Sequence, residues 1–394
     1  MLLTERGFPP QANGSGRIHS MDSIEAGPVT LRQLGSGDIA DITAGCNNAL
    51  VQRFLPQLPR PYTEADARFF VGEYAPAQWA AGGAQFAIAD PLTDRLLGCV
   101  GVHPRGRGAG EIGYWVAPWG RGRRAAANAA RAVSAWAFEQ GYARLEIRTE
   151  LANSPSQRVA IAAGYAREGV QRGGGQGRGG TRYDLITWGR LATDPPGPTP
   201  RLLPDLPGGE LSDGTVTLRP IGVEDTEDVL RTHQLPEVVA AQMPPEPFTP
   251  ERAARRCAHA ESNWLAGAQA TLSIRDAVTD AFAGEIGLYY AEPPTGQAMI
   301  GYDLDPAWRG RGYASRAVRL LTAWAFERTG IARIIAGTAP ENIASQRVLE
   351  AAGFRREGYQ RSRLPGVSGA RIDDLLYALL PDDPVVTPTR TPWQ

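Results

Sequence analysis

The apolar and polar residues in the second half of the chain follow patterns that predict strands and helices in a definite order. Strand patterns fall at residues 215–219, 270–275, 281–290, 297–304, 333–338, 354–360 and 373–379. Helical patterns fall at residues 224–231, 250–266, 313–328 and 343–352. Strands and helices that mix in this way predict an α/β domain built on a mixed sheet.

The first half of the chain repeats this order. Matching segments lie 187 to 189 residues apart: 29–32 with 216–219, 112–114 with 300–302, 135–139 with 323–327, 156–159 with 345–348, and 167–169 with 356–358. A period of this length indicates the duplication of a whole domain, and it excludes a solenoid of short repeats.

Pro-rich sequence separates the two copies. Proline forbids a helix interior and favours an extended, semi-rigid chain. We therefore expect domains at residues 23–192 and 213–381, joined by a Pro/Gly-rich linker at 193–212. The two ends, 1–22 and 382–394, are expected to be a disordered leader and tail.

Composition and charge limit the cellular compartments and the classes of binding partner that fit this sequence. The chain is 42% hydrophobic with a formal net charge of −1, which argues against a general nucleic-acid binder. Its 3 cysteines are isolated, so we expect reduced thiols and no zinc site. No apolar run approaches the ~18 residues of a membrane span. We expect a cytoplasmic protein that needs no metal and no membrane.

The stretch at residues 308–315 is the clearest candidate for a binding site. It lies between the strand pattern at 297–304 and the helix pattern at 313–328, and it is rich in Gly and Arg. Unpaired N–H groups and the helix dipole favour an anion at such a turn. Glycines let the backbone approach a phosphate, and arginines add charge-assisted hydrogen bonds.

These residues carry a family resemblance. Arg309-x-x-Gly312-x-Ala314 resembles the acyl-CoA pyrophosphate loop of the GNAT acetyltransferases. Downstream, Asn342-x-x-Ser345-x-Arg-Val, followed by Gly-Phe, resembles the RimJ/RimL branch, which acetylates N-terminal amines of proteins and assorted small amines. The resemblance implies two GNAT-like acyltransferase domains in tandem.

The resemblance also implies where acetyl-CoA would bind. Its thioester and pantetheine would lie along the strand that ends at Leu304, and its pyrophosphate on the loop that follows. The implied cofactor-binding residues are Asp303, Leu304, Arg309, Gly310, Arg311, Gly312, Tyr313, Ala314, Ser315 and Asn342.

The same resemblance makes Ser345 the candidate acid for the leaving sulfur. Transfer would be direct, so the protein must orient an amine, remove its proton and protonate the thiol. The alternative is that Ser345 only caps or packs its helix. Asn342 fits a cofactor contact and is also a good helix N-cap.

The catalytic base is left open among several carboxylates. In this superfamily the base often sits on the strand before the loop, where the first copy has Glu111 and the second has Met299. Asp303 shares a strand face with Met299, and Glu285 lies one strand earlier. Glu285 is alternatively a structural glutamate. An α-amine needs no dedicated base, because its ordinary pKa of about 8 leaves a neutral fraction at pH 7.

The two copies differ at the phosphate loop. Arg124 occupies the position of Gly312, where a side chain would obstruct the phosphate or force an unfavourable φ. The alternative is that Arg124 itself reaches a phosphate. We therefore expect the C-terminal domain to catalyse. The N-terminal domain is expected to complete the substrate groove as a second subunit would, in a monomer that acts as an internal pseudo-dimer.

The leading hypothesis is an acetyl-CoA-dependent N-acetyltransferase that acts on a primary amine, either a protein N-terminus or a small molecule. One alternative is a non-catalytic acyl-CoA-binding sensor or interaction module. Another is an acyltransferase with a different donor, such as succinyl-CoA. Fold resemblance alone does not choose the acceptor.

Overall fold

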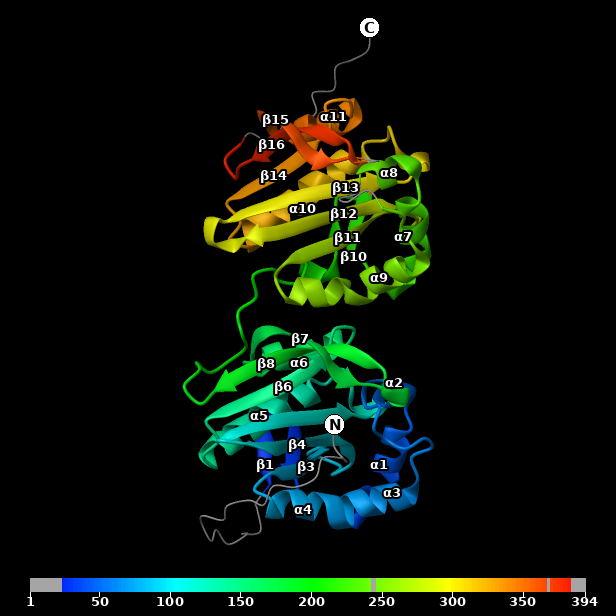
Figure 1. The fold of residues 1–394 in the computed structure, drawn as a ribbon. Coiled ribbons are helices and arrows are strands. Elements are labelled where there is room, and N and C mark those ends of the chain that lie inside the picture. The colour runs from blue at the N-terminus through cyan, green and yellow to red at the C-terminus, as the bar shows by residue number, and fades with distance from the viewer. Residues whose placement is uncertain (1–22, 242–245, 367–368, 384–394) are drawn as a thin grey trace. The chain divides into compact units, whose positions relative to one another are not determined.

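The computed structural model describes residues 23–241, 246–366 and 369–383. It divides into two compact units, Met1–Pro200 and Arg201–Gln394 (Figure 1). The expected leader at 1–22, and the expected tail beyond residue 383, lie outside the described residues.

The N-terminal unit is built on an eight-stranded sheet in the order β1-β2-β3-β4-β5-β6-β8-β7. Its strands are β1 (Ile24–Ala26), β2 (Val29–Arg32), β3 (Ala84–Ala89), β4 (Leu96–Gly106), β5 (Ala109–Val116), β6 (Arg144–Glu150), β7 (Ala166–Gln176) and β8 (Arg182–Leu191). Its helices are α1 (Ile39–Cys46), α2 (Ala49–Phe54), α3 (Glu64–Phe69), α4 (Ala75–Ala80), α5 (Ala125–Glu139) and α6 (Ser154–Ala162).

The C-terminal unit has an eight-stranded sheet in the matching order, β15-β16-β14-β13-β12-β11-β10-β9. Its strands are β9 (Leu211–Ser212), β10 (Val216–Pro220), β11 (Gln269–Asp276), β12 (Phe282–Glu292), β13 (Gln297–Leu304), β14 (Arg333–Thr338), β15 (Arg355–Pro365) and β16 (Arg371–Leu379). Its helices are α7 (Thr226–His233), α8 (Pro236–Ala241), α9 (Pro250–Leu265), α10 (Tyr313–Arg328) and α11 (Ile343–Ala351).

The sheet of each unit splits at its parallel pair of strands. β13 and β14 are paired only from Gln297–Arg333 to Met299–Ile335, although β13 continues to Leu304. In the N-terminal unit the parallel β5–β6 ladder likewise ends at Glu111–Glu146, five residues before β5 ends. Beyond each ladder the strand presents backbone N–H and C=O groups toward the split, and such groups need partners.

Two apolar cores are formed by described residues of the C-terminal unit. The larger one contains Ala317, Val318 and Leu321 of α10, whose spacing of three to four residues puts them on one helix face. A smaller core joins α7 and α9 through Val229 and Cys257. Helices therefore cover the sheet with separate cores, and the β13–β14 split lies beside the larger one.

The segment expected to be a linker contributes to the C-terminal core. Leu203 and Leu206 are both buried in the same cluster as α10. The indole of Trp264 on α9 donates to the carbonyl of Pro204. The compact C-terminal unit starts at Arg201, before the domain start expected at 213. The apolar contacts of this segment were not predicted, because its proline-rich composition is typical of a linker.

The predicted fold class is confirmed: two α/β domains with mixed sheets occur in tandem. The strands at 297–304 and 333–338 and the helix at 313–328 have the bounds that the pattern predicted. The short elements β9 and α8 were not predicted, because two to six residues carry too little periodicity.

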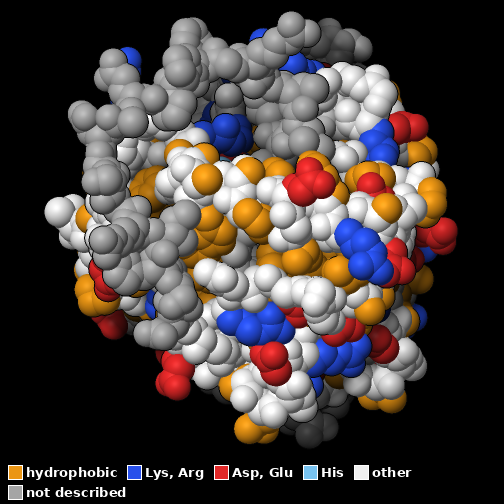
Figure 2. Space-filling model, turned by 90° about the horizontal axis from the view of Figure 1, so that it is seen from below, with side chains coloured by type: hydrophobic (Ala, Val, Ile, Leu, Met, Phe, Trp, Pro, Cys, Tyr) orange, Lys and Arg blue, Asp and Glu red, His pale blue; other side chains and the backbone are white. Residues whose placement is uncertain are grey.

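Charge and hydropathy are mixed over the surface that can be seen. Figure 2 shows one face on which arginine and acidic side chains lie next to one another, with apolar side chains scattered between them. Among the described residues no helix combines the length and apolar character that a membrane span needs.

Candidate active site

A tyrosine and a serine meet across the split of the C-terminal sheet. Tyr302 projects from the unpaired part of β13, and its hydroxyl lies 2.9 Å from Oγ of Ser345 on α11. The same hydroxyl donates to the backbone carbonyl of Ser345 at 3.2 Å. Burial raises the pKa of Tyr302 to about 12, so this hydroxyl keeps its proton at neutral pH.

Asn342 places Ser345 at the split. Its Oδ1 accepts a hydrogen bond from the backbone N–H of Ser345 at 3.1 Å, and Asn342 is the N-cap of α11. The structure thus brings two predicted site residues together. It also shows that Asn342 has the capping role weighed against a cofactor contact, and one side chain can do both.

The loop before α10 presents free backbone donors. The first bond of the helix runs from the N–H of Arg316 to the carbonyl of Gly312 at 3.2 Å, and no side chain caps this helix. The N–H groups of Tyr313, Ala314 and Ser315 precede that bond. Gly310 and Gly312 have positive φ values of 73° and 79°. The predicted phosphate loop therefore has the backbone that an anion needs.

The loop side chains are less free than the sequence suggested. The guanidinium of Arg309 donates to the carbonyl of Leu304 and, at 2.7 Å, to Glu237. Arg311 lies over the ring of Trp308 at 5.4 Å from its centroid and remains exposed. Arg311 is therefore the arginine better placed to meet a phosphate, while Arg309 ties the loop to the end of β13.

A buried charged cluster lies at the open end of the split. Glu285 of β12 is 3% exposed, and its Oε2 lies 2.5 Å from Nε2 of His233, the last residue of α7. Nε of Arg256 on α9 lies 3.5 Å from Oε1 of Glu285. Burial pushes the pKa of Glu285 upward, but the His233 hydrogen bond and the Arg256 charge outweigh it, so its pKa is lowered.

Asp303 stands next to this cluster. It is directly opposite Glu285 in the antiparallel β12–β13 ladder, where Cβ atoms lie about 5 Å apart. Burial raises the pKa of Asp303, and the negative charge of Glu285 raises it further. Of the two predicted carboxylates, Asp303 has the raised pKa and is the better proton acceptor, whereas the partners of Glu285 favour its ionised form.

His233, Arg256 and Tyr302 were not singled out by sequence reasoning as functional residues. His233 and Arg256 lie on helices far from Glu285 in the chain, so no local motif joins them. A comparison of the two copies could have found His233, because the equivalent residue, 187 positions earlier, is Cys46.

The N-terminal unit retains the frame of this site. Tyr114 contacts Ser156 across the split, with a hydroxyl-to-hydroxyl distance of 2.9 Å. Asn153 accepts from the N–H of Ser156, as Asn342 does from that of Ser345. Strand split, hydroxyl pair and capping asparagine are therefore common to both units.

The charged cluster is absent from the corresponding place in the N-terminal unit, all of which lies within the described residues. Cys46 ends α1 where His233 ends α7, and Cys99 pairs with Trp115 where Glu285 pairs with Asp303. Both thiols are buried in one apolar cluster, and Trp115 packs against it. Burial raises the pKa of both thiols, so they stay protonated and uncharged. This corner of the N-terminal unit is apolar.

Arg124 adopts the backbone conformation that its glycine counterpart has. Its φ is 56° and its ψ 20°, in the left-handed region, as for Gly312. For a residue with a Cβ this conformation costs roughly 1–2 kcal/mol. The predicted strain at this position is therefore present, and the N-terminal loop keeps its shape with an exposed arginine side chain on it.

The carboxylate considered as a base in the first copy is held in ion pairs. Both Arg105 and Arg148 donate to Oε2 of Glu111, Arg148 at 2.6 Å. Burial pushes the pKa of Glu111 upward, but the charges of Arg148 and Arg105 outweigh it and lower the pKa. Glu111 is therefore a poor general base. Within the described ranges, no group of three or more His, Cys, Asp or Glu residues could hold a metal.

Comparisons with known proteins agree with this geometry. The family model described as "Acetyltransferase (GNAT) domain" matches residues 29–166 and 215–355. The probable N-acetyltransferase YjcK of Bacillus subtilis (strain 168) is 32% identical over 175 residues, covering 43% of this chain and 96% of that protein. An uncharacterized N-acetyltransferase, p20 of Bacillus licheniformis, is 32% identical over 166 residues, which are 42% of this chain and 92% of p20.

Solved structures of similar proteins match at lower identity. The ribosomal-protein-S5-alanine acetyltransferase from Vibrio fischeri is 24% identical, with a TM-score of 0.40, and the match covers 44% of this chain and 97% of that one. The two family-model matches together span more than half of the chain, one in each unit. The chain therefore belongs to the GNAT acetyltransferase family, as two tandem copies of its domain.

Proposed function

We propose that the C-terminal unit transfers an acetyl group from acetyl-CoA directly to a primary amine, and that the N-terminal unit does not catalyse. The observation that carries this proposal is the split between β13 and β14, with the Tyr302–Ser345 pair across it and the glycine loop at its end. Each part supplies one requirement of acyl transfer.

The donor would lie in the split. The unpaired edge of β13 beyond Met299 can hydrogen-bond an extended pantetheine arm as a neighbouring strand would. The N–H groups of Tyr313, Ala314 and Ser315 would donate to a diphosphate bound at the start of α10. Asp303, Leu304, Gly310, Arg311 and Asn342 remain the other proposed donor contacts, and Arg309 anchors the loop.

The two proton transfers would take place on opposite faces of the sheet. Tyr302 and Asp303 are adjacent on β13, so their side chains point to opposite sides. Tyr302 reaches Ser345 on α11, while Asp303 lies beside Glu285, whose partners are on α7 and α9. The amine would thus approach on the α7 side, and the sulfur would leave toward α11.

The proposed chemistry balances with these residues and solvent water. The amine nitrogen bonds to the acyl carbon as the carbon–sulfur bond breaks. Asp303 takes the proton from the amine, aided by its raised pKa. The leaving sulfur receives a proton through the hydroxyl pair of Ser345 and Tyr302. The pair regains that proton from solvent water, to which Asp303 releases the proton of the amine. Glu285 would act by holding its charge beside Asp303, not by taking the proton itself.

The acceptor is a primary amine in this proposal because the similar proteins YjcK and p20 are named N-acetyltransferases. The panel of amines described below distinguishes a protein N-terminus from a small amine as the acceptor.

Matched charge insertions in the two loops test the proposal. Gly312→Asp places a carboxylate where the diphosphate would bind, and Arg124→Asp makes the equivalent change in the N-terminal unit. Asp tolerates the left-handed conformation in both loops. Thiol release from acetyl-CoA would be measured with a panel of peptides bearing free N-termini, polyamines and amino acids.

We expect Gly312→Asp to raise KM for acetyl-CoA by at least about tenfold, because repulsion removes roughly 1.4 kcal/mol or more of binding. Arg124→Asp should leave KM unchanged. Loss of turnover only in Arg124→Asp would assign catalysis to the other unit. A folded protein that releases no thiol with any amine would contradict the proposed activity.

A further inference from the structure

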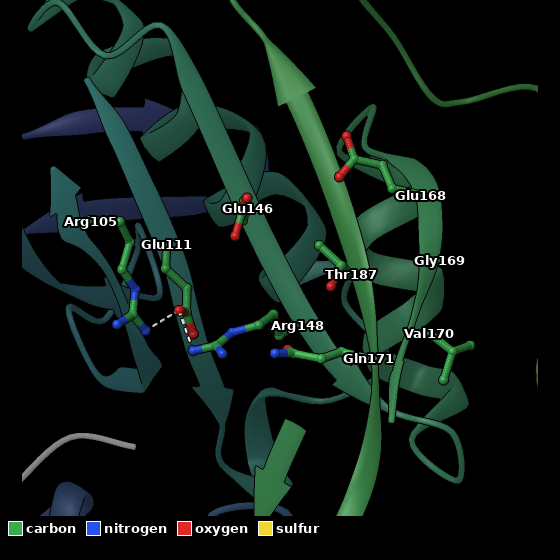
Figure 3. A pocket seen from close by; sticks show the side chains of 9 residues that line it. All are labelled: Arg105, Glu111, Glu146, Arg148, Glu168, Gly169, Val170, Gln171 and Thr187. Atoms are coloured by element: carbon green, nitrogen blue, oxygen red, sulfur yellow. Dashed lines mark hydrogen bonds and ion pairs between the residues drawn. The ribbon is translucent and has the colours of Figure 1, made fainter. Parts of the chain in front are cut away.

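The N-terminal unit has an open hollow of about 560 Å³ on its sheet, away from the Cys46–Cys99 corner (Figure 3). It is lined by residues of five strands: Arg105, Glu111, Glu146, Arg148, Glu168, Gly169, Val170, Gln171 and Thr187. Glu111, at the base of the β5–β6 split, stands beside Glu146 of β6 in the parallel ladder. The acyl transfer proposed for the C-terminal unit makes no use of this hollow.

Small residues keep the hollow open. Arg148 of β6 pairs with Thr187 of β8, which in turn pairs with Gly169 of β7. A Cβ added at Gly169 would meet no atom within 4 Å. Large charged side chains therefore stand at the sides, while the floor beneath β8 and β7 leaves room for a small molecule.

One side of the hollow carries surplus positive charge. Arg105 and Arg148 approach Glu111 from opposite directions and share its single carboxylate, both through Oε2 (Figure 3). Two guanidinium groups against one carboxylate leave one positive charge without a partner in this group. Gln171 extends from β7 toward Arg148 and adds an uncharged amide (Figure 3).

The other side carries surplus negative charge. Arg144 donates to Glu146 at 2.9 Å and to Glu168 at 2.8 and 2.5 Å, so one guanidinium serves two carboxylates. Glu146 and Glu168 line the hollow, whereas Arg144 does not. The hollow is therefore dipolar, with an arginine side at β4–β6 and a glutamate side at β6–β7.

The fold does not require this arrangement. The β13–β14 ladder and its continuation put Met299, Ile335 and Gly337 where the N-terminal unit has Glu111, Glu146 and Arg148. The C-terminal unit keeps only the pair Arg333–Glu357, which corresponds to Arg144–Glu168. The same sheet thus forms with uncharged residues at three of these positions.

We propose that the N-terminal hollow binds a small zwitterion of the amino-acid or short-peptide class. The carboxylate of the ligand would take the unshared donors of Arg105 and Arg148, and its cationic group would bind Glu146 and Glu168. Arg148 on β6 and Glu168 on β7 are separated by β8, so about 10 Å lies between their strands. Charges several bonds apart, as in lysine or a dipeptide, fit this separation better than those of glycine.

The site is independent of the proposed acyl transfer, so its test needs no acyl-CoA. The full chain would be titrated calorimetrically with L-lysine and with glycyl-glycine. Glutarate, which lacks the cation, and 1,5-diaminopentane, which lacks the carboxylate, are the matched probes. We expect at least one zwitterion to bind, and both matched probes to bind about tenfold or more weakly.

Variants locate the binding. Arg148→Met and Glu168→Gln should each weaken zwitterion binding roughly 10- to 100-fold, the loss expected for one charge-assisted hydrogen bond. Glu357→Gln, which breaks the corresponding pair in the C-terminal unit, should have no effect. If Arg148→Met fails to fold, Glu168→Gln decides, because Glu168 is 40% exposed and its loss leaves the Arg144–Glu146 pair.

The proposal is overturned if neither zwitterion binds to the folded protein. It is also overturned if glutarate or 1,5-diaminopentane binds as tightly as the zwitterions, since only one charged group of the ligand would then contribute to binding. Unchanged binding in Glu168→Gln, or a loss in Glu357→Gln, would place the zwitterion outside this hollow.

Discussion

The two units share a frame and differ in the chemistry placed on it. Both split their sheet after three parallel pairs and both join a tyrosine to a serine across the split. At the open end, however, the C-terminal unit has Glu285 with His233 and Arg256, and the N-terminal unit has Cys99 in an apolar cluster. A duplicated fold can therefore keep its architecture while one copy loses, or never acquires, a reactive group.

The second difference lies at the base of the split. There the N-terminal unit holds Glu111 between two arginines, and the C-terminal unit has Met299, which is 38% exposed. The C-terminal unit thus has its charged residues at the open end of the split, and the N-terminal unit has them at the base. This exchange underlies the two proposals, an acyl-CoA site in the C-terminal unit and a zwitterion site in the N-terminal unit.

The largest effect is expected at Glu285. Glu285→Gln removes a buried charge and leaves Arg256 without its carboxylate, which should cost about 3–5 kcal/mol of stability. Cys99→Ala at the matching position should cost only about 1–2 kcal/mol. Urea unfolding followed by tryptophan fluorescence, with separate transitions for the two units, measures both. Equal costs would mean that the charged cluster stabilises its unit no more than the buried thiol stabilises the other.

The same carboxylate gives this stability a pH dependence. The pKa of Glu285 is lowered in the folded protein, so the stabilisation is fully present above its ordinary value of 4.5. It is lost as pH falls through the lower, folded-state pKa. Acid unfolding of the C-terminal unit should therefore lose this dependence in Glu285→Gln, while Cys99→Ala should leave it intact.

The hydroxyl pairs sharpen the comparison further. Ser345→Ala should lower kcat roughly 10²- to 10³-fold, because proton transfer by a placed group contributes this much. Ser156→Ala makes the same change in the N-terminal unit and should stay within about twofold of the wild type. The rate of thiol release measures both. Comparable losses would show that both units turn over acetyl-CoA.

Asp303 should control the acid side of the pH–rate profile. As the proposed base it must be ionised, so the rate should fall as pH drops through its raised pKa. Asp303→Asn should lower kcat/KM about 10- to 100-fold and remove that acid limb. A profile with its acid limb intact would assign the base elsewhere, or to no residue for an α-amine.

The smallest effect concerns the loop backbone. Arg124→Gly should relieve the strain of φ 56° and stabilise the N-terminal unit by about 0.5–1 kcal/mol. Gly312→Ala should destabilise the C-terminal unit by about 1 kcal/mol, since its φ is 79°. Thermal melts of the two variants would show shifts of opposite sign. Shifts of the same sign would mean that the two loops are not equivalent.

Much of the fold followed from the sequence because the same pattern occurs twice. Strand 297–304 and helix 313–328 flank a short Gly/Arg turn, which fixed their ends. The contact of Ser345 with Tyr302 could not be predicted, since it depends on how far β13 separates from β14. A pairing register is a property of the folded sheet and leaves no local signal.

The charged cluster escaped prediction for a different reason. Glu285 and Asp303 were considered as catalytic carboxylates, but His233 was not singled out. Its place at the end of α7 brings it to Glu285, which is 52 residues away in the chain. A long-range contact of this kind emerges only when the helix packs on the sheet.

The count of acetyl-CoA sites tests the central claim most directly. Calorimetric titration of the full chain with acetyl-CoA would be done for the wild type, for Gly312→Arg and for Arg124→Gly. The asymmetric account predicts one site in the wild type, abolished by Gly312→Arg, which copies the N-terminal loop into the C-terminal unit. Two wild-type sites, with one surviving Gly312→Arg, would contradict it, because the N-terminal unit would then bind the donor as well.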